Sequence, residues 1–509
     1  MPRFSRSVLS LLTAASLAAA GCRVAAPVAP PRAAAVPLAF PLAAVTPVAD
    51  SAATAAAGAT GPITAPDSAS FARQPWRELF ADPNLVSLID TALQANPDLR
   101  ITLQRIEIAR ADLRVRRGAL LPQVEGVASV GVERFGEYTL DGVGNYDTNL
   151  SPNVEGKRRI PNPTPDFFLG LRSSWEIDLW GKLRQRRQAA YLRLLATERG
   201  RHLVQTQLVA EVARQYFTLL SHDNELLVLR RNQQFQERAL DIVRTLKGAG
   251  RANELAVQQF RAQLLRTRAL EAKTQQQIAA TENTLNRLLG RYPRPIARPV
   301  SILEQPLPSR LTAGLPAATL LRRPDVRQAE LELVATRADV SAARAAFLPS
   351  LKLTPFVGLH AYRASVLFTT PGSLAYGLLA GLSAPLFNRA ELQADYRRSV
   401  AQQQIAYSTY QKAIQVGFEE VTTNLRGIEN YQRVFDLQQE EVEALQQAVS
   451  ISDDLFKANY ATYLEVISAQ RNVLDAELEL TDTRRQQFLL LIDLYRALGG
   501  GWTPVAAGE

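Results

Sequence analysis

Four segments of the chain alternate between apolar and polar residues. Over residues 167–179 the odd positions are mainly apolar, whereas the even positions include Gly170, Arg172 and Ser174. A period of two with one apolar face is the pattern of a β-strand whose two sides face different surroundings. The sequence therefore predicts a strand here, and the same alternation predicts three more over residues 124–132, 351–360 and 373–386.

Two long tracts rich in Gln, Ala, Arg, Leu and Glu contain no proline, from Lys182 to about Lys247 and from Arg389 to about Asn459. As helices they would each extend on the order of 100 Å. Apolar residues between positions 442 and 478 step by three and four, which is the spacing of a coiled coil. We expect each tract to reverse at a short turn, near residues 248–250 and 458–460, into a second, antiparallel helix.

The chain contains an internal repeat. The segment at residues 96–100 (NPDLR) returns at residues 323–327 (RPDVR), and in the same register residues 121–122 (LP) return at 348–349. Chance does not keep one register across that distance. Each copy is predicted to run helix, strand, loop, strand, long helix, turn and long helix, and the loop of the first copy is the longer one.

Four strands with one apolar face cannot span a membrane alone. Such a sheet leaves two unpaired edges, and lipid offers no hydrogen bonds to satisfy them. Three chains that together supply twelve strands would close a barrel with its polar face inward. The longest apolar stretches elsewhere, such as residues 488–492, are too short for transmembrane helices. If the chain spans a membrane, we therefore expect the β-strands to do so.

The amino terminus predicts export and lipid attachment. Arg3 and Arg6 precede an apolar run at residues 8–20, which fits a secretory signal. The small residues that follow end in Gly21-Cys22 and resemble a bacterial lipobox, in which Cys22 would carry the acyl chains. The alternative is an ordinary leader with an incidental cysteine. Residues 27–66 are mostly Ala, Pro, Val, Thr and Gly and predict an extended tether.

Composition excludes several classes of protein. The hydrophobic content of 47% excludes global disorder, and a single cysteine excludes intramolecular disulfides and Cys-rich zinc sites. The three histidines lie far apart without a ligand spacing, so we predict no metal site. The net charge of +9 is spread over 58 basic and 49 acidic residues, which favours a solvated helical surface over a nucleic-acid interface.

Motifs for enzymatic chemistry are missing. The nearest approach to Gly-x-Ser-x-Gly, at residues 381–385 (GLSAP), lacks the second glycine, and no Walker A sequence is present. Glycines 499–501 follow a predicted helix instead of preceding one, so they are not placed to hold a phosphate. We therefore predict no catalytic residues and no cofactor, and we expect that the protein is not an enzyme.

Six dispersed segments carry a family resemblance. In this order along the chain they are similar to segments of the outer-membrane efflux lipoproteins of the TolC and OprM type. The resemblance covers about residues 70–503, and the segments lie at residues 74–83 (QPWRELFADP), 174–182 (SWEIDLWGK), 323–327 (RPDVR), 385–388 (PLFN), 463–471 (YLEVISAQR) and 494–502 (LYRALGGGW).

The resemblance implies an α+β membrane protein that forms a homotrimeric duct. Its parts would be a twelve-stranded β-barrel in the outer membrane, a long α-helical barrel through the periplasm and a mixed equatorial belt. The implied partners are outer-membrane lipid, a periplasmic adaptor and an inner-membrane efflux transporter, whose substrates the duct would conduct passively to the outside. A duct for type I protein secretion and a structural coiled-coil protein of the envelope are the alternatives.

The resemblance also organises the chain. Each of the two repeats would contain one strand pair and one pair of long helices. The expected segments are a signal peptide at 1–21, the lipidated Cys22 with its tether at 22–66, a first repeat at 67–290 (strands in 123–180, long helices in 182–290), an equatorial connection at 291–316, a second repeat at 317–500 (strands in 350–387, long helices in 389–499) and an equatorial tail at 501–509.

Two groups of site residues follow from this reading. In the family the helix tips close the duct at rest, and the second tip offers Asp453, Asp454 and Tyr460 as candidates for the narrowest lining. The alternative is that the two aspartates only solvate the outer helical surface. The second group is the junction between strand and helix, where Trp180 suits either a membrane interface or simple packing. The junction residues are Trp180, Gly181, Phe387 and Asn388.

Overall fold

The computed structural model describes residues 75–80, 82–299, 301–307, 320–385, 387, 390–458 and 460–501. The described residues form two compact units. Unit 1 comprises residues 107–195 and 331–408, and unit 2 comprises the described parts of 32–106, 196–330 and 409–509. The predicted signal peptide, Cys22 and the tether lie outside the described residues, as does Asn388.

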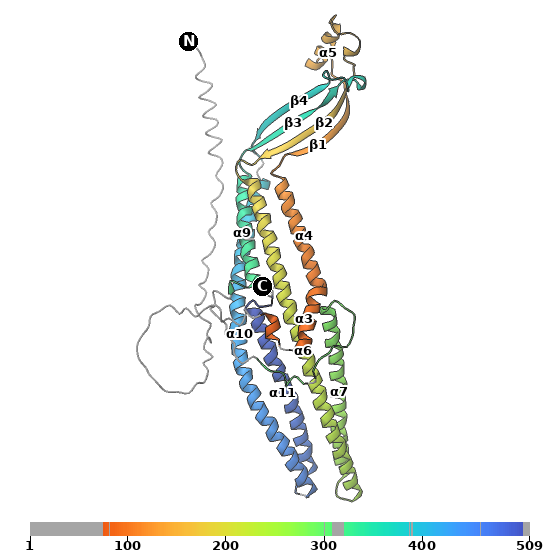
Figure 1. Cartoon of the computed structure of the whole chain (residues 1–509), viewed down its shortest axis with the longest axis vertical. Coiled ribbons are helices and arrows are strands. Elements are labelled where there is room, and N and C mark those ends of the chain that lie inside the picture. Colours follow the sequence, from red (N-terminus) through yellow and green to blue (C-terminus); the bar gives the residue numbers. More distant parts are fainter. Residues whose placement is uncertain are drawn as a thin grey trace, which may run out of the picture. The chain divides into compact units, whose positions relative to one another are not determined.

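Unit 1 contains one four-stranded antiparallel sheet in the order β1-β2-β3-β4. Figure 1 shows the strands side by side in that order. The four predicted strands are confirmed. The last strand was expected to reach residue 386, but it ends at Ser383. Pro385 follows closely and has no N–H to donate to a neighbouring strand. The strands are β1 (Gln123–Glu133), β2 (Thr164–Ile177), β3 (Ser350–Ala361) and β4 (Leu374–Ser383).

The connection between β1 and β2 is not the plain loop that the sequence predicted. It contains the helix α5 (Leu140–Leu150) and the short 3-10 helix η3 (Gly156–Arg158). Thr139 caps α5 because its hydroxyl accepts a hydrogen bond from the Gly142 N–H at 3.1 Å. The connection between β3 and β4 is shorter and holds the 3-10 helix η4 (Ala364–Val366).

The predicted helical hairpins are confirmed. The first consists of α6 (Lys182–Gly248) and α7 (Glu254–Leu288), and the second of α10 (Ala390–Lys457) and α11 (Tyr463–Ala497). Each return helix has a side-chain cap at its start. The Asn253 carboxamide accepts from the Ala256 N–H, and Thr462 with Glu465 forms a capping box.

Shorter helices precede the strands in each half. α4 (Pro97–Gly118) and α9 (Pro324–Ala345) both begin with proline, which suits a first helical position because no donor is lost there. Two further helices, α2 (Trp76–Leu79) and α3 (Pro83–Ala95), come before α4. The helices α4, α6, α9 and α10 each contribute residues to both units.

The main hydrophobic core of unit 2 joins α2 and α3 to the long helices. Ile89 of α3 and Leu220 of α6 are fully buried there, and Phe217 stacks on Phe488 with ring centroids 4.1 Å apart. Asp82 holds the start of α3 in place, because its carboxylate accepts from the Asn84 N–H and from the Tyr216 hydroxyl. Burial, and then this bond to Asp82, raises the pKa of the Tyr216 hydroxyl.

A second core lies near the helix turns. It contains Leu240 and Val243 of α6, Val257 and Phe260 of α7, and Val466 of α11. Because one residue of α11 is buried among residues of α6 and α7, the two hairpins share this core. Of the residues in the predicted coiled-coil spacing, Leu474 is buried with Val228 of α6, and Val442 is buried with residues of α11, so this spacing is used for packing both between hairpins and within one.

In unit 2 the residues before Pro97 and Pro324 make the same kind of bond: each side chain donates to a backbone carbonyl at the end of a long helix. The Asn96 side-chain amide donates to the Leu288 carbonyl at 2.8 Å, and the Arg323 guanidinium donates to the Ala497 carbonyl at 2.8 Å. Each bond ties the start of a short helix, α4 or α9, to the end of a return helix, α7 or α11. We call these bonds the Asn96 tie and the Arg323 tie. The repeated segments at residues 96–100 and 323–327 therefore play the same structural role in the two halves of the chain.

The Arg323 tie is reinforced by charge. Arg323 is 4% exposed, and its guanidinium also contacts the carboxylates of Asp325 and Glu420, each at 2.7 Å. Burial alone would lower the pKa of Arg323, but the two carboxylates outweigh it and raise the pKa. Arg496 of α11 bonds to the same Glu420 at 2.8 Å. α9, α10 and α11 thus meet at one buried ion cluster.

Candidate functional site

The register of the sheet separates charge from apolar surface. Arg172 is paired with Glu125 on β1 and with Phe356 on β3, and His360 is paired with Phe168. Because side chains alternate along each strand, residues paired in this way lie on the same face. All charged residues and the histidine of the four strands fall on this one face, which we call the polar face: Glu125, Glu133, Asp166, Arg172, Glu176, Lys352 and His360.

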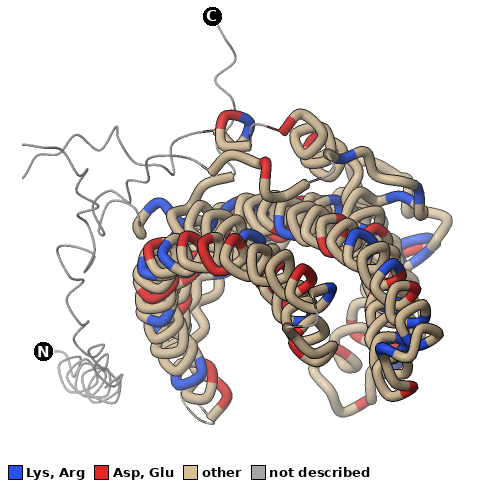
Figure 2. Tube along the Cα trace, turned by 90° about the horizontal axis from the view of Figure 1, so that it is seen from below, with Lys and Arg blue, Asp and Glu red and all other residues tan. Residues whose placement is uncertain are grey.

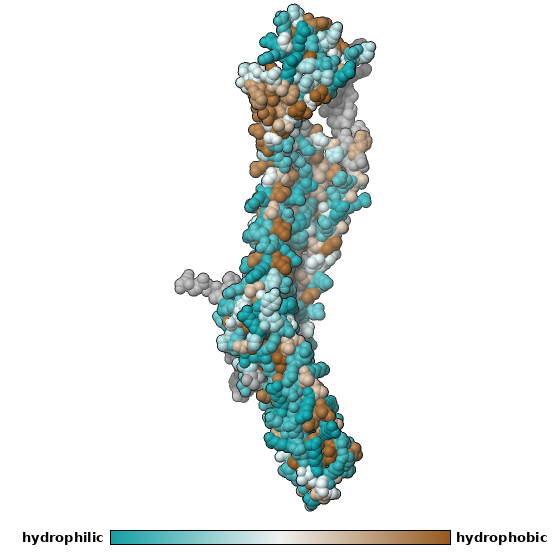
Figure 3. Space-filling view, turned by 90° about the vertical axis from the view of Figure 1, so that its right-hand side faces the viewer, coloured by the Kyte–Doolittle hydropathy of each residue, from teal (hydrophilic) through white to brown (hydrophobic). Residues whose placement is uncertain are grey.

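The opposite face is apolar and unburied in the single chain. Figure 3 shows hydrophobic side chains gathered over part of the sheet. Leu171 at the centre of β2 is 51% exposed, and its register partner Val357 is 47% exposed. A soluble monomer rarely leaves such a continuous apolar surface uncovered. We call this side the apolar face, and its other exposed large residues are Val124, Val130, Val132, Leu169, Leu374, Tyr376, Leu378 and Leu382.

The long helices differ from the sheet in how apolar residues and charges are distributed over them. None of the helices described in the structure is both long enough and apolar enough to cross a membrane. On the long helices basic and acidic residues are mixed, as Figure 2 shows. This distribution does not form the one-sign stripe that a nucleic-acid interface would need.

The junction between β2 and α6 is built around Asp178. This carboxylate accepts hydrogen bonds from the Leu183 N–H at 3.0 Å and the Arg184 N–H at 2.9 Å, so it caps the first turn of α6. Burial alone would raise the pKa of Asp178, but the bonds from Arg184 and Leu183 outweigh it and lower the pKa. The cap requires a sharp turn, and Gly181 provides it with a φ of 80°. Sequence reasoning selected Gly181 and missed Asp178.

Trp180 and Trp175 anchor the same junction. The Trp180 indole N–H donates to the Pro349 carbonyl at 2.7 Å, next to the start of β3, while its ring stays 54% exposed. The Trp175 N–H donates to the Leu120 carbonyl at 3.0 Å, next to the start of β1. The two tryptophans therefore join neighbouring strand ends. Phe387, the matching residue of the second repeat, is 89% exposed.

The predicted aperture residues lie together at the turn between α10 and α11. Asp453 pairs with Lys457 one helical turn later, and Asp454 lies 3.9 Å from the same ammonium. The hydrogen bond from Lys457 to Asp453, supported by their opposite charges, raises the pKa of Lys457. Tyr460 is 84% exposed and Asp454 keeps 78% of its side chain exposed. Asp454 and Tyr460 are thus the accessible members of the set.

A buried polar junction lies further along the same helices. Glu477 of α11, with only 8% of its side chain exposed, accepts from Asn232 of α6 at 3.2 Å and from Gln446 of α10 at 2.8 Å. Arg231 of α6 pairs with the same carboxylate at 2.5 Å. One buried acid therefore connects both hairpins. Sequence reasoning missed it, because Glu477 lies between residues 474 and 478 of the predicted coiled-coil spacing and is not itself part of that spacing.

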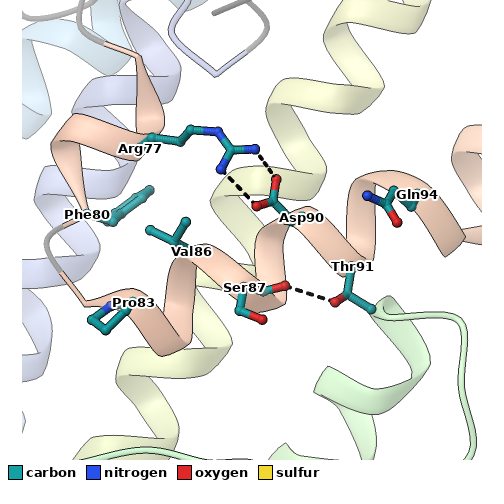
Figure 4. A pocket seen from close by; sticks show the side chains of 8 residues that line it. All are labelled: Arg77, Phe80, Pro83, Val86, Ser87, Asp90, Thr91 and Gln94. Atoms are coloured by element: carbon teal, nitrogen blue, oxygen red, sulfur yellow. Dashed lines mark hydrogen bonds and ion pairs between the residues drawn. The ribbon is translucent and has the colours of Figure 1, made fainter.

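Unit 2 also holds a surface cavity of about 490 Å³ over α2 and α3. Figure 4 shows Arg77 facing Asp90, and one of the two bonds between them measures 2.9 Å. Nearby the Thr91 hydroxyl donates to the Ser87 carbonyl at 2.9 Å. The two ionisable side chains of the cavity neutralise each other, so its lining offers no free acid, base or activated nucleophile.

Known proteins resemble this chain over most of its length. A family model described as outer membrane efflux protein matches residues 88–291 and 315–500. The solvent efflux pump outer membrane protein SrpC of Pseudomonas putida is 32% identical over 84% of this chain and 87% of its own length. The pyoverdine export outer membrane protein OpmQ of Pseudomonas aeruginosa is 33% identical over 85% of this chain and 88% of its own.

A solved structure agrees with these matches. The open state of the MtrE outer membrane channel of Neisseria gonorrhoeae superimposes with a TM-score of 0.73 at 27% identity. The superposition covers 84% of this chain and 92% of that one.

Proposed function

Because the chain belongs to the outer membrane efflux protein family, we propose that it forms the exit duct of a tripartite efflux pump. In this role it conducts substrates passively from an inner-membrane transporter, through a periplasmic adaptor, to the outside. The two-faced sheet of unit 1 carries the proposal. Its polar face provides a wall for a water-filled duct, and its apolar face provides a surface for lipid.

The open edges of the sheet favour a homotrimer. β1 and β4 end the strand order, and each has only one neighbour within the described chain. Hydrocarbon cannot satisfy the unpaired N–H and C=O groups of these edges. Three copies of the four strands close a twelve-stranded barrel, and the long helices of the three copies form the periplasmic tunnel. The matching Asn96 and Arg323 ties support the division of the chain into two repeats, at residues 67–290 and 317–500.

Cys22 anchors the protein to the outer membrane in this proposal. Several acyl chains on one residue hold a protein far more firmly than a single chain does. Mass spectrometry of the mature amino terminus should find a lipid-modified cysteine as the first residue. An unmodified terminus at another residue would exclude the anchor, while the barrel proposal would stand.

The cargo is not carried over from the relatives, because one relative is named for the efflux of solvent and another for the export of pyoverdine. A duct for type I secretion would have the same architecture and differs only in its partner pump. A structural coiled-coil protein of the envelope is the weaker alternative, since it has no use for a sheet with one polar and one apolar face.

Planar bilayer recording tests the duct directly. Purified full-length protein should produce stepwise increases in ionic conductance, and chemical crosslinking of the same sample should give trimers. A protein that inserts into the bilayer as trimers and conducts no ions, even when the helix tips that form the proposed gate are removed, would refute the duct. A conducting sample without trimers would refute the twelve-stranded arrangement.

A further inference from the structure

The polar face of the sheet contains a patch of aromatic side chains that a water-filled wall does not require. Phe168 points to the polar face with Asp166 and Arg172, yet it is only 4% exposed. Phe356 and His360 contact its ring edge-on, with centroids 6.2 Å and 6.1 Å away. We call Phe168, Arg172, Phe356 and His360 the aromatic patch.

Glycines make room for this patch. A Cβ at Gly170 or at Gly358 would come within 3.0 Å of the Phe168 ring, and a Cβ at Gly377 would come within 2.5 Å of the Phe356 ring. The Phe168 ring therefore lies against bare backbone of its own strand and of β3, and the Phe356 ring lies against bare backbone of β4, where a side chain would displace them. This packing fixes the rings in place before anything binds.

Arg172 covers the patch without a charged partner. Its guanidinium carbon lies 4.6 Å from the centre of the Phe168 ring, a cation–π contact. Within the described part of the chain no carboxylate is in ion-pair distance of Arg172, although Glu125 is its register partner on β1. Asp166, the other nearby acid, pairs with His360. The N–H groups of an exposed guanidinium thus remain available beside Phe356, which is 38% exposed.

We propose that the aromatic patch is a binding site for small aromatic carboxylates that pass along the polar face. The carboxylate accepts two parallel hydrogen bonds from the Arg172 guanidinium, and the ligand ring, which then points away from the guanidinium, packs against the exposed Phe356. Neither group alone suffices: a plain carboxylate lacks the ring contact, and an aromatic cation is repelled by Arg172. The site rests on the proposed duct, where the polar face lines the lumen.

Single-channel recording of the full-length trimer tests the site. Benzoate is the probe, acetate controls for charge and benzylamine controls for the ring. Benzoate should interrupt the current in a concentration-dependent way, whereas acetate and benzylamine at equal concentration should not. Arg172→Gln should weaken the block by benzoate about tenfold, because the hydrogen bonds to a charged group are lost. Lys352→Gln is the matched control, since it removes a cation from the same face away from the patch.

Two further variants sharpen the result. Arg172→Lys keeps the charge but loses the planar fork, so it should weaken the block as well. Glu125→Gln removes the nearest acid on β1 and should strengthen it. Equal block by benzoate and acetate, or equal loss in Arg172→Gln and Lys352→Gln, would overturn the site and leave the duct intact. A trimer that conducts no ions in plain potassium chloride, even when the helix tips that form the proposed gate are removed, would overturn the duct and the site together.

Discussion

The substitution Leu171→Arg tests whether the apolar face of the sheet contacts lipid. Leu171 is the eighth of the fourteen residues of β2, so in a barrel it faces lipid near the middle of the membrane. An arginine at this depth costs roughly 2–4 kcal/mol per chain. At about 1.4 kcal/mol per factor of ten, Leu171→Arg should lower the folding equilibrium roughly 30-fold to 700-fold for each copy. Three copies per barrel would multiply the effect.

Urea titration of folding into lipid vesicles measures this cost, with heat-modifiable migration of the trimer as the readout. Ser174→Arg places the same side chain on the polar face of the same strand, paired with Gln123, and should shift the titration little. Arg172→Gln should also be tolerated. Similar losses for Leu171→Arg and Ser174→Arg would show that the assignment of the faces, or the barrel itself, is wrong.

The remaining predictions concern the helices. Asp178→Ala should destabilise the β2–α6 junction by about 1 kcal/mol in urea unfolding, as for a lost helix cap. Because folding lowers the pKa of Asp178, its contribution is present above the unfolded pKa and is lost as the pH falls through the folded pKa, so the variant should show a smaller acid sensitivity. Arg323→Ala should cost about 2 kcal/mol in the same assay, since it removes a buried guanidinium together with its bonds to the Ala497 carbonyl and to the carboxylates of Asp325 and Glu420; a loss below about 1 kcal/mol would contradict this. In the proposed trimer, Asp454→Cys or Tyr460→Cys should form one disulfide between two of the three subunits and block export until reductant is added; full export through tips linked in this way would exclude the proposed gate.

The strands and hairpins could be predicted from the sequence because their signals are periodic. Alternation over residues 167–179 identified β2, and the absence of proline from Lys182 onward identified α6. The helix α5 escaped because Gly142 and Gly144 lower helix propensity and only the Thr139 cap favours it. Helix starts at Pro97 and Pro324 were predictable because proline suits that position.

Site residues were harder to predict when their role depends on distant partners. Phe168 breaks the alternation of β2, and Gly170, two residues later, explains only part of this. The rest of the explanation is Gly358, which belongs to β3 and lies 190 positions away from Phe168. Glu477 likewise acquires its role only when α6, α10 and α11 meet. Cys22 and the signal peptide remain predictions, because they lie outside the described residues.

The Asn96 and Arg323 ties hold equivalent corners by different chemistry. The first is a bond between an uncharged amide and a carbonyl, which neither acid nor salt weakens directly. The second is reinforced by two carboxylates beside the same cation, so removing their charge by substitution should loosen the base of the α10–α11 hairpin and leave that of α6–α7 unchanged. In the proposed trimer, six identical hairpins could only move together, whereas two kinds of hairpin in each chain allow one set of three to move while the other three hold the subunits in place.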